Sequence, residues 1–260
     1  MLPPLVIPDL ASKACLGTGS SRGIGAAVAR GLGACGARVA VHYNTGKAEA
    51  EAVAVDIAQA GRQAILLAGD LSTPGMSARL IDEMVRQFGH LDSLINNAGD
   101  VIERYPVAET PDELFERHVA VNIRPVFEDS RRAVLQFRAQ GGGGTIVNVS
   151  SVVARTSGGS GSSLYASAKA FVATFTRALA KEVAKEKIRV NAVSPGVIDT
   201  PMQDRTTPVE QINTALAAIP VARLERPDEC VGTILYLCSP TLSGYVTGQI
   251  LEVNGGIIMP

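Results

Sequence analysis

The chain has 260 residues, of which 46% are hydrophobic and 19% are charged, and its formal net charge at pH 7 is -1. This composition is typical of a folded globular protein and excludes a disordered or fibrous chain. The near balance of charge gives no electrostatic reason to expect nucleic acid or an anionic membrane as a partner.

The terminal segment and the scattered cysteines and histidines narrow the class further. The four cysteines form no CxxC pair, and no histidine lies at a metal-ligand interval from them, so we expect buried thiols, a reducing compartment and no metal site. Residues 1–10 contain three prolines and lack signal-peptide features, which predicts a short extended arm. No uncharged run of 18 apolar residues occurs, so we expect no membrane span and a cytoplasmic location.

Short apolar runs alternate along the chain with longer alanine-rich or amphipathic segments, a pattern that indicates parallel strands joined by helices. The predicted strands are residues 14–17, 38–42, 63–68, 93–96, 145–149, 189–193 and 249–253. The predicted helices are residues 24–35, 47–60, 76–88, 111–140, 163–186 and 227–237. We therefore predict an α/β fold: a single doubly wound Rossmann-type domain over residues 1–260, with a seven-stranded parallel sheet flanked by helices on both faces.

Three segments between these elements have distinctive compositions. Residues 141–144 are four glycines and are expected to end a helix. Residues 157–163 are rich in Gly and Ser and are interpreted as an active-site loop, with a plain flexible loop as the alternative. Residues 199–222 carry two Thr-Pro pairs and weak periodicity, which favours a mobile substrate lid.

The first predicted strand runs into the glycine-rich turn Thr18-Gly-Ser-Ser-Arg-Gly-Ile-Gly25 and then into a helix. Glycines let the backbone approach a pyrophosphate, and the free amides at a helix start favour anions. A tight turn without a ligand is the alternative. The expected cofactor contacts in this turn are Gly19, Ser21, Arg22, Gly23, Ile24 and Gly25.

The end of the second strand bears on the choice of dinucleotide. NAD sites usually carry an acidic residue there, on the ribose hydroxyls, but this strand ends Val41-His-Tyr-Asn-Thr45 without one. Arg22 is placed to reach a 2′-phosphate, and Asn44 and Thr45 to donate hydrogen bonds to it. We therefore predict NADP(H) as the preferred cofactor with NAD(H) still open; an Arg22 that only faces solvent is the alternative.

The third and fourth strands end in residues suited to the rest of the cofactor. Asp70 is placed to accept a hydrogen bond from the adenine amino group and Leu71 to add a backbone contact, although an aspartate here can equally start a turn. The small residues after the fourth strand suit close passage of a ribose. They are Asn97, Ala98 and Gly99.

Tyr165 and Lys169 are four residues apart, which puts both side chains on one face of a helix. Hydride transfer to a carbonyl needs a proton for the developing alkoxide. A phenol of pKa about 10 is a poor acid–base group at neutral pH, and a nearby ammonium lowers that pKa. The pair therefore indicates proton transfer by Tyr165, with Lys169 also able to hold the nicotinamide ribose; a surface helix face is the alternative.

The glycine turn, Asn96-Asn-Ala-Gly99, Tyr165-Ala-Ser-Ala-Lys169 and Ser194-Pro-Gly-Val-Ile-Asp-Thr200 together resemble the short-chain dehydrogenase/reductase family. The resemblance covers roughly residues 10–258 and is closest to members of the 3-oxoacyl-thioester (acyl carrier protein) reductase type. It departs from the family at Gly17, where a bulky apolar residue is usual, and at Asn254, where Asp is common.

The resemblance implies roles for further residues. Ser151 corresponds to the hydroxyl that binds the substrate oxygen, although the spacing to Tyr165 is one residue longer than usual and Ser150 stays an alternative. Asn122 corresponds to the asparagine that bends a helix and holds a water in a proton relay to Lys169, with a polar core residue as the alternative. The segment expected at the carboxamide and pyrophosphate contributes Pro195, Gly196, Ile198 and Thr200.

These observations predict an NADP(H)-dependent oxidoreductase that interconverts a ketone or aldehyde and an alcohol, with a carbonyl or 3-oxoacyl substrate favoured. An NAD(P)-dependent polyol, sugar or secondary-alcohol dehydrogenase is the second hypothesis, and a non-catalytic dinucleotide-binding regulator is disfavoured by the intact Ser–Tyr–Lys set. Apolar residues such as Phe127, Leu135, Phe171 and Phe175 on two long helices, together with the segment 246–260, fit the interfaces of a homotetramer or a homodimer, although core burial would explain the same residues.

Overall fold

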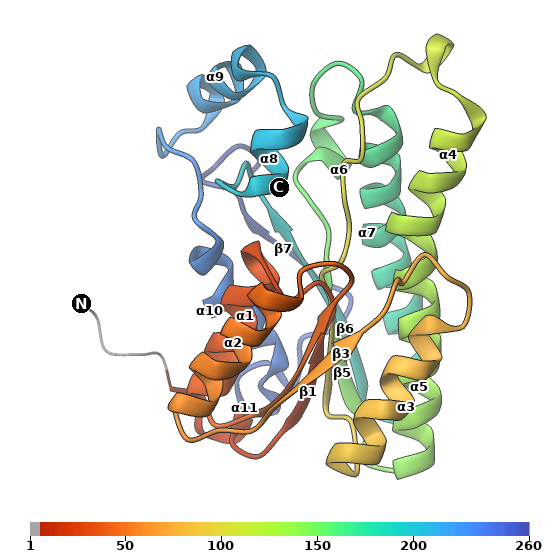
Figure 1. Ribbon diagram of the computed structural model, residues 1–260, viewed down its shortest axis with the longest axis vertical. Coiled ribbons are helices and arrows are strands. Elements are labelled where there is room, and N and C mark those ends of the chain that lie inside the picture. Colours follow the sequence, from red (N-terminus) through yellow and green to blue (C-terminus); the bar gives the residue numbers. More distant parts are fainter. Residues whose placement is uncertain (1–5, 260) are drawn as a thin grey trace.

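The computed structural model describes residues 6–259, and its centre is a seven-stranded, fully parallel sheet in the order β3-β2-β1-β4-β5-β6-β7 (Figure 1). The predicted doubly wound α/β fold is therefore confirmed. The strands are β1 (Ala14–Gly17), β2 (Arg38–Tyr43), β3 (Ala64–Ala68), β4 (Ser93–Asn96), β5 (Gly144–Val149), β6 (Ile188–Pro195) and β7 (Ile250–Val253). Each lies within a residue or two of its predicted range.

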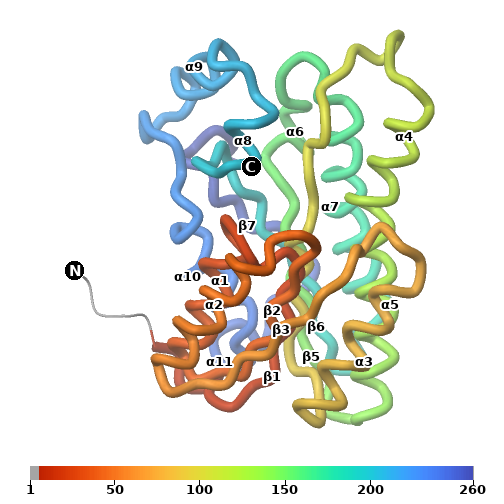
Figure 2. Tube along the Cα trace, in the orientation of Figure 1, coloured from red at the N-terminus to blue at the C-terminus, as the bar shows by residue number. Residues whose placement is uncertain are grey.

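Helices cover both faces of the sheet, and each face has its own hydrophobic core. The helices are α1 (Gly23–Ala34), α2 (Lys47–Gln59), α3 (Met76–Phe88), α4 (Asp112–His118), α5 (Arg124–Gln140), α6 (Val153–Thr156), α7 (Ser163–Val183), α8 (Pro201–Thr206), α9 (Val209–Ala218), α10 (Val231–Cys238) and α11 (Pro240–Ser243). One core lies under α1, α2 and α10, and the other lies under α3, α5 and α7 (Figures 1 and 2).

The helix predicted over residues 111–140 is not continuous. After α4 the chain makes a wide π-helical turn, η3 (Val119–Ile123), before α5 begins. Pro125 lies in the first turn of α5 and has no N–H to donate to the preceding turn, which accounts for a change of helical register at this point. Asn122 sits within the wide turn and is buried.

The N-terminal segment differs from the predicted extended arm where it can be described. The short 3-10 turn η1 (Pro8–Leu10) precedes β1, and the side chains of Ile7 and Leu10 are buried in the core under α1. Ile7 and Leu10 are three residues apart, and a turn lets both side chains reach the same core, which an extended chain would not. Residues 1–5 of the predicted arm lie outside the described residues.

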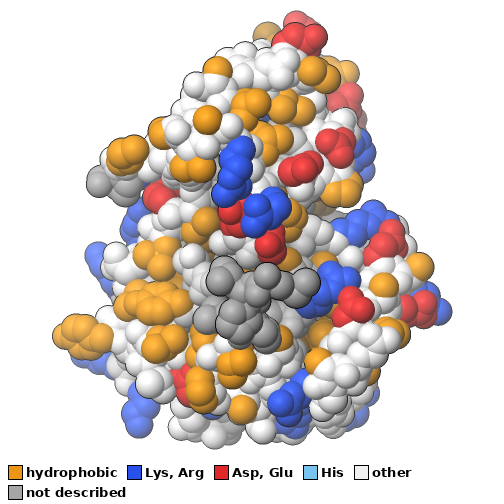
Figure 3. Space-filling model, turned by 90° about the vertical axis from the view of Figure 1, so that its left-hand side faces the viewer, with side chains coloured by type: hydrophobic (Ala, Val, Ile, Leu, Met, Phe, Trp, Pro, Cys, Tyr) orange, Lys and Arg blue, Asp and Glu red, His pale blue; other side chains and the backbone are white. Residues whose placement is uncertain are grey.

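Helices α8 and α9 occupy the predicted lid and lie above the carboxyl ends of the strands (Figure 1). The two Thr-Pro pairs mark their starts: Thr200 caps α8, with Pro201 in its first turn, and Pro208 precedes α9. No residue of α9 is fully buried. Hydrophobic side chains lie at the surface in the upper part of Figure 3, the region where α9 sits.

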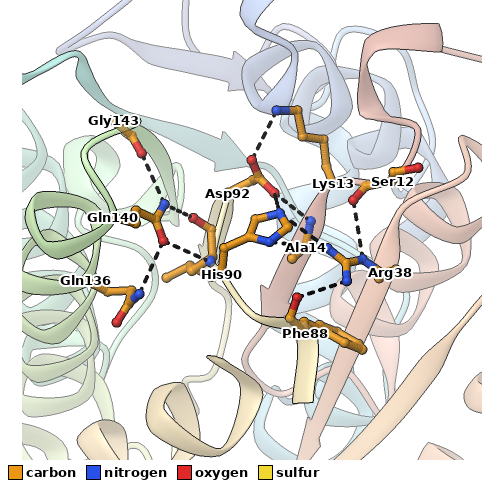
Figure 4. Close-up of polar contacts among 11 residues, drawn as sticks. Ser12, Lys13, Ala14, Arg38, Phe88, His90, Asp92, Gln136, Gln140 and Gly143 are labelled. Atoms are coloured by element: carbon orange, nitrogen blue, oxygen red, sulfur yellow. Dashed lines mark hydrogen bonds and ion pairs between the residues drawn. The ribbon is translucent and has the colours of Figure 1, made fainter. Parts of the chain in front are cut away.

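A polar cluster around Asp92 connects the amino ends of neighbouring strands, at the end of the sheet opposite the cavity-bearing carboxyl ends (Figure 4). The Asp92 carboxylate accepts hydrogen bonds from the Ala14 backbone amide at 2.8 Å and from Lys13 Nζ at 3.1 Å, and it lies 2.7 Å from His90 Nε2. Arg38, at the start of β2, donates to the Phe88 carbonyl oxygen at 2.9 Å. The cluster therefore joins the starts of β1, β2 and β4, far from the strand ends that bound the site.

Asp92→Ala should lower the free energy of unfolding by about 1–3 kcal/mol, because the buried Ala14 amide loses its side-chain acceptor. Urea unfolding of the variant and the wild type measures the difference. Asp82→Ala is the matched control, since it removes only the exposed ion pair with Arg132 and should cost at most about 1 kcal/mol. Equal effects of the two substitutions would contradict the role given to Asp92.

Candidate active site

A cavity of about 820 Å³ opens at the carboxyl ends of the strands, where β1 and β4 lie side by side and the sheet order reverses. Ligands of doubly wound folds bind at this kind of switch point. The predicted residues on the cavity wall are Gly19, Ser21, Arg22, Gly23, Ile24, Asn44, Thr45, Asp70, Leu71, Asn97, Ala98, Gly99, Ser151, Tyr165, Lys169, Pro195, Gly196, Ile198 and Thr200. Gly25 and Asn122 are predicted residues that lie behind this wall.

The glycine turn is held closely against the end of β4. Gly19 and Gly23 have φ angles of 62° and 54°, values that L side chains rarely adopt. A β-carbon at Gly25 would lie 2.3 Å from the Gly19 carbonyl oxygen, so this glycine serves the packing of the turn. The Asn97 side-chain amide donates to the carbonyl oxygens of Thr18 and Gly19, at 2.9 and 3.1 Å.

His42 is a site residue that the sequence analysis missed. Its Nδ1 accepts a hydrogen bond from the Gly19 amide at 3.0 Å, and its Nε2 lies 3.0 Å from the Gly69 carbonyl oxygen, to which it donates. This pairing requires a neutral ring, and burial lowers the pKa of His42 accordingly. The only signal in the sequence is a polar residue near the end of an apolar strand.

Arg22 has a partner that local sequence did not reveal. Its guanidinium forms an ion pair and two hydrogen bonds with Glu49, in the first turn of α2. Both side chains are exposed, and a hydrogen bond from its own backbone amide, followed by that of Arg22, holds the pKa of the Glu49 carboxyl group below its usual value. The end of β2 carries no acid, as predicted, but α2 brings one to the same corner of the cavity.

Tyr165 and Lys169 project from α7 on one face, as their spacing predicts. Lys169 is buried, its Nζ donates to the Val149 carbonyl oxygen at 2.8 Å, and it lies 5.6 Å from the centre of the Tyr165 ring. Loss of solvent lowers the pKa of Lys169 to about 8.

Lys169 was expected to lower the pKa of the Tyr165 phenol, but other influences on this pKa are larger. The surrounding protein raises the pKa of Tyr165 by desolvation, Asp100 adds to that rise, and Arg104 is the cation that opposes it. The sequence argument considered only the lysine one turn away, whereas the charges that shift the pKa of Tyr165, those of Asp100 and Arg104, come from the loop after β4.

The two candidate serines have different surroundings. The Ser150 hydroxyl is buried and donates to the Lys169 carbonyl oxygen at 3.0 Å, so its proton is used within the fold. Ser151 is half-buried at the cavity wall, and its Oγ accepts only a long hydrogen bond from the Val153 amide, at 3.3 Å. The Ser151 hydroxyl therefore keeps its proton available to the cavity.

Asn122 holds the backbone beside Lys169. Its side-chain oxygen accepts from the Asp100 amide and its side-chain nitrogen donates to the Asp100 carbonyl oxygen, both at 2.9 Å. A β-carbon at Gly99 would lie 3.0 Å from Asn122 Oδ1 and 3.3 Å from Lys169 Nζ, so both groups flank this glycine.

These features fit a dinucleotide. A helix leaves its first amides without intrahelical acceptors, and the start of α1 faces the cavity. Lys169 uses one of its three donors within the fold and has no carboxylate partner among residues 6–259, which suits ribose hydroxyls. Within the same range, no group of three His, Cys, Asp or Glu residues is placed to hold a metal ion, and no helix is long and apolar enough to cross a bilayer.

Comparison with known proteins agrees with this geometry. A family model described as enoyl-(acyl carrier protein) reductase matches residues 17–258. A hydroxynaphthalene reductase-like protein, Arp2 of Metarhizium robertsii, is 35% identical over 262 residues, covering 96% of each chain. A 3-oxoacyl-[acyl-carrier-protein] reductase of Synechocystis is 35% identical over 250 residues, covering 96% of this chain and 98% of its own.

Solved structures share the whole fold. A short-chain dehydrogenase from Burkholderia cenocepacia in complex with NADP superposes with a TM-score of 0.89 at 31% identity, covering 96% of this chain and 99% of its own. An NADH-dependent reductase responsible for alginate metabolism, A1-R′, also gives a TM-score of 0.89, at 32% identity, covering 98% of this chain and 100% of its own.

Lys169→Met should raise the stability of the cofactor-free protein at pH 7 by about 1–3 kcal/mol, because a charge no longer has to be buried. The folded pKa of about 8 lies below the unfolded value of 10.5. The unfolded chain therefore binds more protons between these values, and wild-type stability rises with pH there. Denaturant unfolding at pH 7 and pH 10 should show the advantage of the variant shrinking.

Lys181→Met on the exposed side of α7 is the control and should change stability little at either pH. A Lys169→Met protein that is less stable than the wild type at pH 7, with no dependence on pH, would show that burial of the ammonium is not costly.

Proposed function

The chain belongs to the short-chain dehydrogenase/reductase family and is an oxidoreductase of carbonyl and alcohol groups, and we propose that it reduces a ketone or aldehyde with NADPH. The observation that carries this proposal is that Ser151, Tyr165 and Lys169 line the same cavity as the glycine turn. A carbonyl or 3-oxoacyl compound is the substrate class that the reductase names of the relatives support.

Each site residue has a separate role in the reduction of the carbonyl group. Tyr165 donates its phenol proton to the carbonyl oxygen, and the Ser151 hydroxyl donates a hydrogen bond to the same oxygen. NADPH, when bound, supplies the hydride to the carbonyl carbon. Lys169 holds the nicotinamide ribose and, as a cation, favours the phenolate that remains.

Asn122 acts behind this trio. Its side chain is fixed by the two hydrogen bonds to the Asp100 backbone, and its oxygen flanks Gly99 together with Lys169 Nζ. We assign it the water that relays a proton from solvent towards Lys169. The helix break at η3 supports this role, because a wide turn displaces backbone groups from their regular pairing.

The preference for NADPH rests on Arg22, which we propose binds the 2′-phosphate with help from Asn44 and Thr45. Glu49 must then give up Arg22 to the phosphate, so this carboxylate weakens the preference. The structural neighbours include both an NADP complex and an NADH-dependent reductase, and NAD(H) stays the competing cofactor.

We propose a homotetramer, with a homodimer as the simpler form. Phe127 and Leu135 of α5 are 43% and 51% exposed. The Phe127 ring meets Phe175 of α7 edge-on at 6.2 Å between ring centres, and Phe175 stacks on Phe171 at 5.5 Å. Exposed apolar side chains on α5, beside half-buried phenylalanines of α7, support an interface with a second copy. Light scattering of the purified chain gives the mass.

We place the enzyme in the cytoplasm, where its four buried cysteines would stay reduced.

Tyr165→Phe and Ser151→Ala should each lower kcat for carbonyl reduction at least about a hundredfold, because each removes a group that acts on the developing alkoxide. Both variants should still bind NADPH, which fluorescence titration measures. Ser150→Ala is the matched control and should retain more activity than Ser151→Ala. The reverse order of the two serine variants would reassign the catalytic hydroxyl to Ser150.

Arg22→Met should raise KM for NADPH by about tenfold to a hundredfold and change KM for NADH much less, as expected for loss of a charge-assisted hydrogen bond. Glu49→Gln should move the ratio the other way by a few-fold, because it frees Arg22. Steady-state kinetics with both cofactors tests this. A wild-type enzyme that prefers NADH, unaffected by Arg22→Met, would overturn the cofactor proposal and favour the polyol or alcohol dehydrogenase.

A further inference from the structure

Arg104 is a cation on the wall of the cavity that the proposed chemistry does not use. It lies in the loop after β4 and donates from Nη2 to Thr207 Oγ1 and from Nε to the Thr206 carbonyl oxygen, at 2.9 and 2.8 Å, and from Nη1 to Ser162 Oγ. Its partners belong to the lid and to the loop before α7. It therefore lies where the lid meets the start of α7, the helix that carries Tyr165.

The charge of Arg104 is not compensated within residues 6–259. All three of its hydrogen-bond acceptors are neutral, and no carboxylate lies within ion-pair distance. Asp100, an acidic residue of the same loop, is already bound by both oxygens to Arg205 of the lid, at 2.7 Å each. Asp100 therefore balances the charge of Arg205 and leaves that of Arg104 without an acidic partner in the described part of the chain.

A partly buried cation without a counterion is costly, and neutral side chains could join the same loops at a lower desolvation cost. The guanidinium has five N–H donors in a fixed fork, of which three are used, so two are left. Such a fork matches a carboxylate. Tyr165 and Arg104 influence each other electrostatically, which places the cation near the group that meets the carbonyl oxygen.

We propose that Arg104 recognises an anionic group on the substrate, so that the enzyme reduces an oxo acid whose carboxylate lies within a few bonds of the reacting carbonyl. This inference rests on the proposed reductase function and names its substrate class. Arg104 then acts in substrate binding and selection, while Tyr165 and Ser151 act on the carbonyl oxygen.

The test compares short 2-oxo and 3-oxo acids with their methyl esters, which have the same skeleton without the charge, as substrates with NADPH. The wild type should prefer the acids in kcat/KM by at least tenfold. Arg104→Met should remove that preference by lowering kcat/KM for the acids at least tenfold while changing the esters less than threefold. Arg104→Lys, which keeps the charge but loses the fork, should retain part of it.

The double variant Asp100→Asn/Arg205→Met is the matched control, because it removes the neighbouring arginine together with the carboxylate that balances it and so leaves the net charge of this region unchanged. It should alter acids and esters alike. Equal losses of kcat/KM for acids and esters in Arg104→Met would show that Arg104 only connects the two loops or positions Tyr165. That result would overturn the inference. A shift of the pH profile without a change in acid preference would do the same.

If the chain is not a reductase, no carbonyl compound will oxidise NADPH in its presence, which differs from a loss of the preference for acids alone. A binding measurement keeps the inference testable in that case as well. Added to the NADPH-bound protein, an oxo acid should raise the Tm of the wild type more than its ester does, and the difference should vanish in Arg104→Met. Equal shifts for acid and ester in the wild type would contradict the inference.

Discussion

The close contact between the glycine turn and the end of β4 is the constraint on which the site depends. Two parallel strands that are neighbours in the sheet but far apart in sequence bring Gly19 and Asn97 together, and the side-chain amide of Asn97 joins them. Gly25 permits this approach because any side chain would strike the Gly19 carbonyl oxygen. The turn held here lines the cavity together with the start of α1.

The same principle, a backbone group held by a distant side chain, recurs around the cavity. His42 holds the other side of Gly19, and Asn122 holds Asp100. Each side chain uses both a donor and an acceptor. His42 can do so only as one tautomer of the neutral ring, and Asn122 only in one orientation of its side-chain amide. The rigidity of the site thus comes from a few buried polar groups on ordered elements, while α8 and α9 above it have no fully buried residue.

Local patterns in the sequence predicted what depends on short spacing. Strand runs, the glycine turn and the one-turn separation of Tyr165 and Lys169 are properties of adjacent residues, and the structure places them as expected. Glu49, His42 and Arg104 were missed because their partners lie 27, 23 and 58 residues away or more. The electrostatics of Tyr165 was misjudged for the same reason, since Asp100 and Arg104 come to it through the fold.

The weak burial of α9 has a consequence for how the molecule moves. A helix with no fully buried residue contributes little to the cooperative core, so it can unfold locally at a small fraction of the global unfolding free energy. Its amide hydrogens should then exchange with solvent orders of magnitude faster than those of β1 and β4, whose residues are all buried. Local unfolding of α9 and global unfolding of the sheet therefore have separate free energies, and α9 can open while the sheet stays folded.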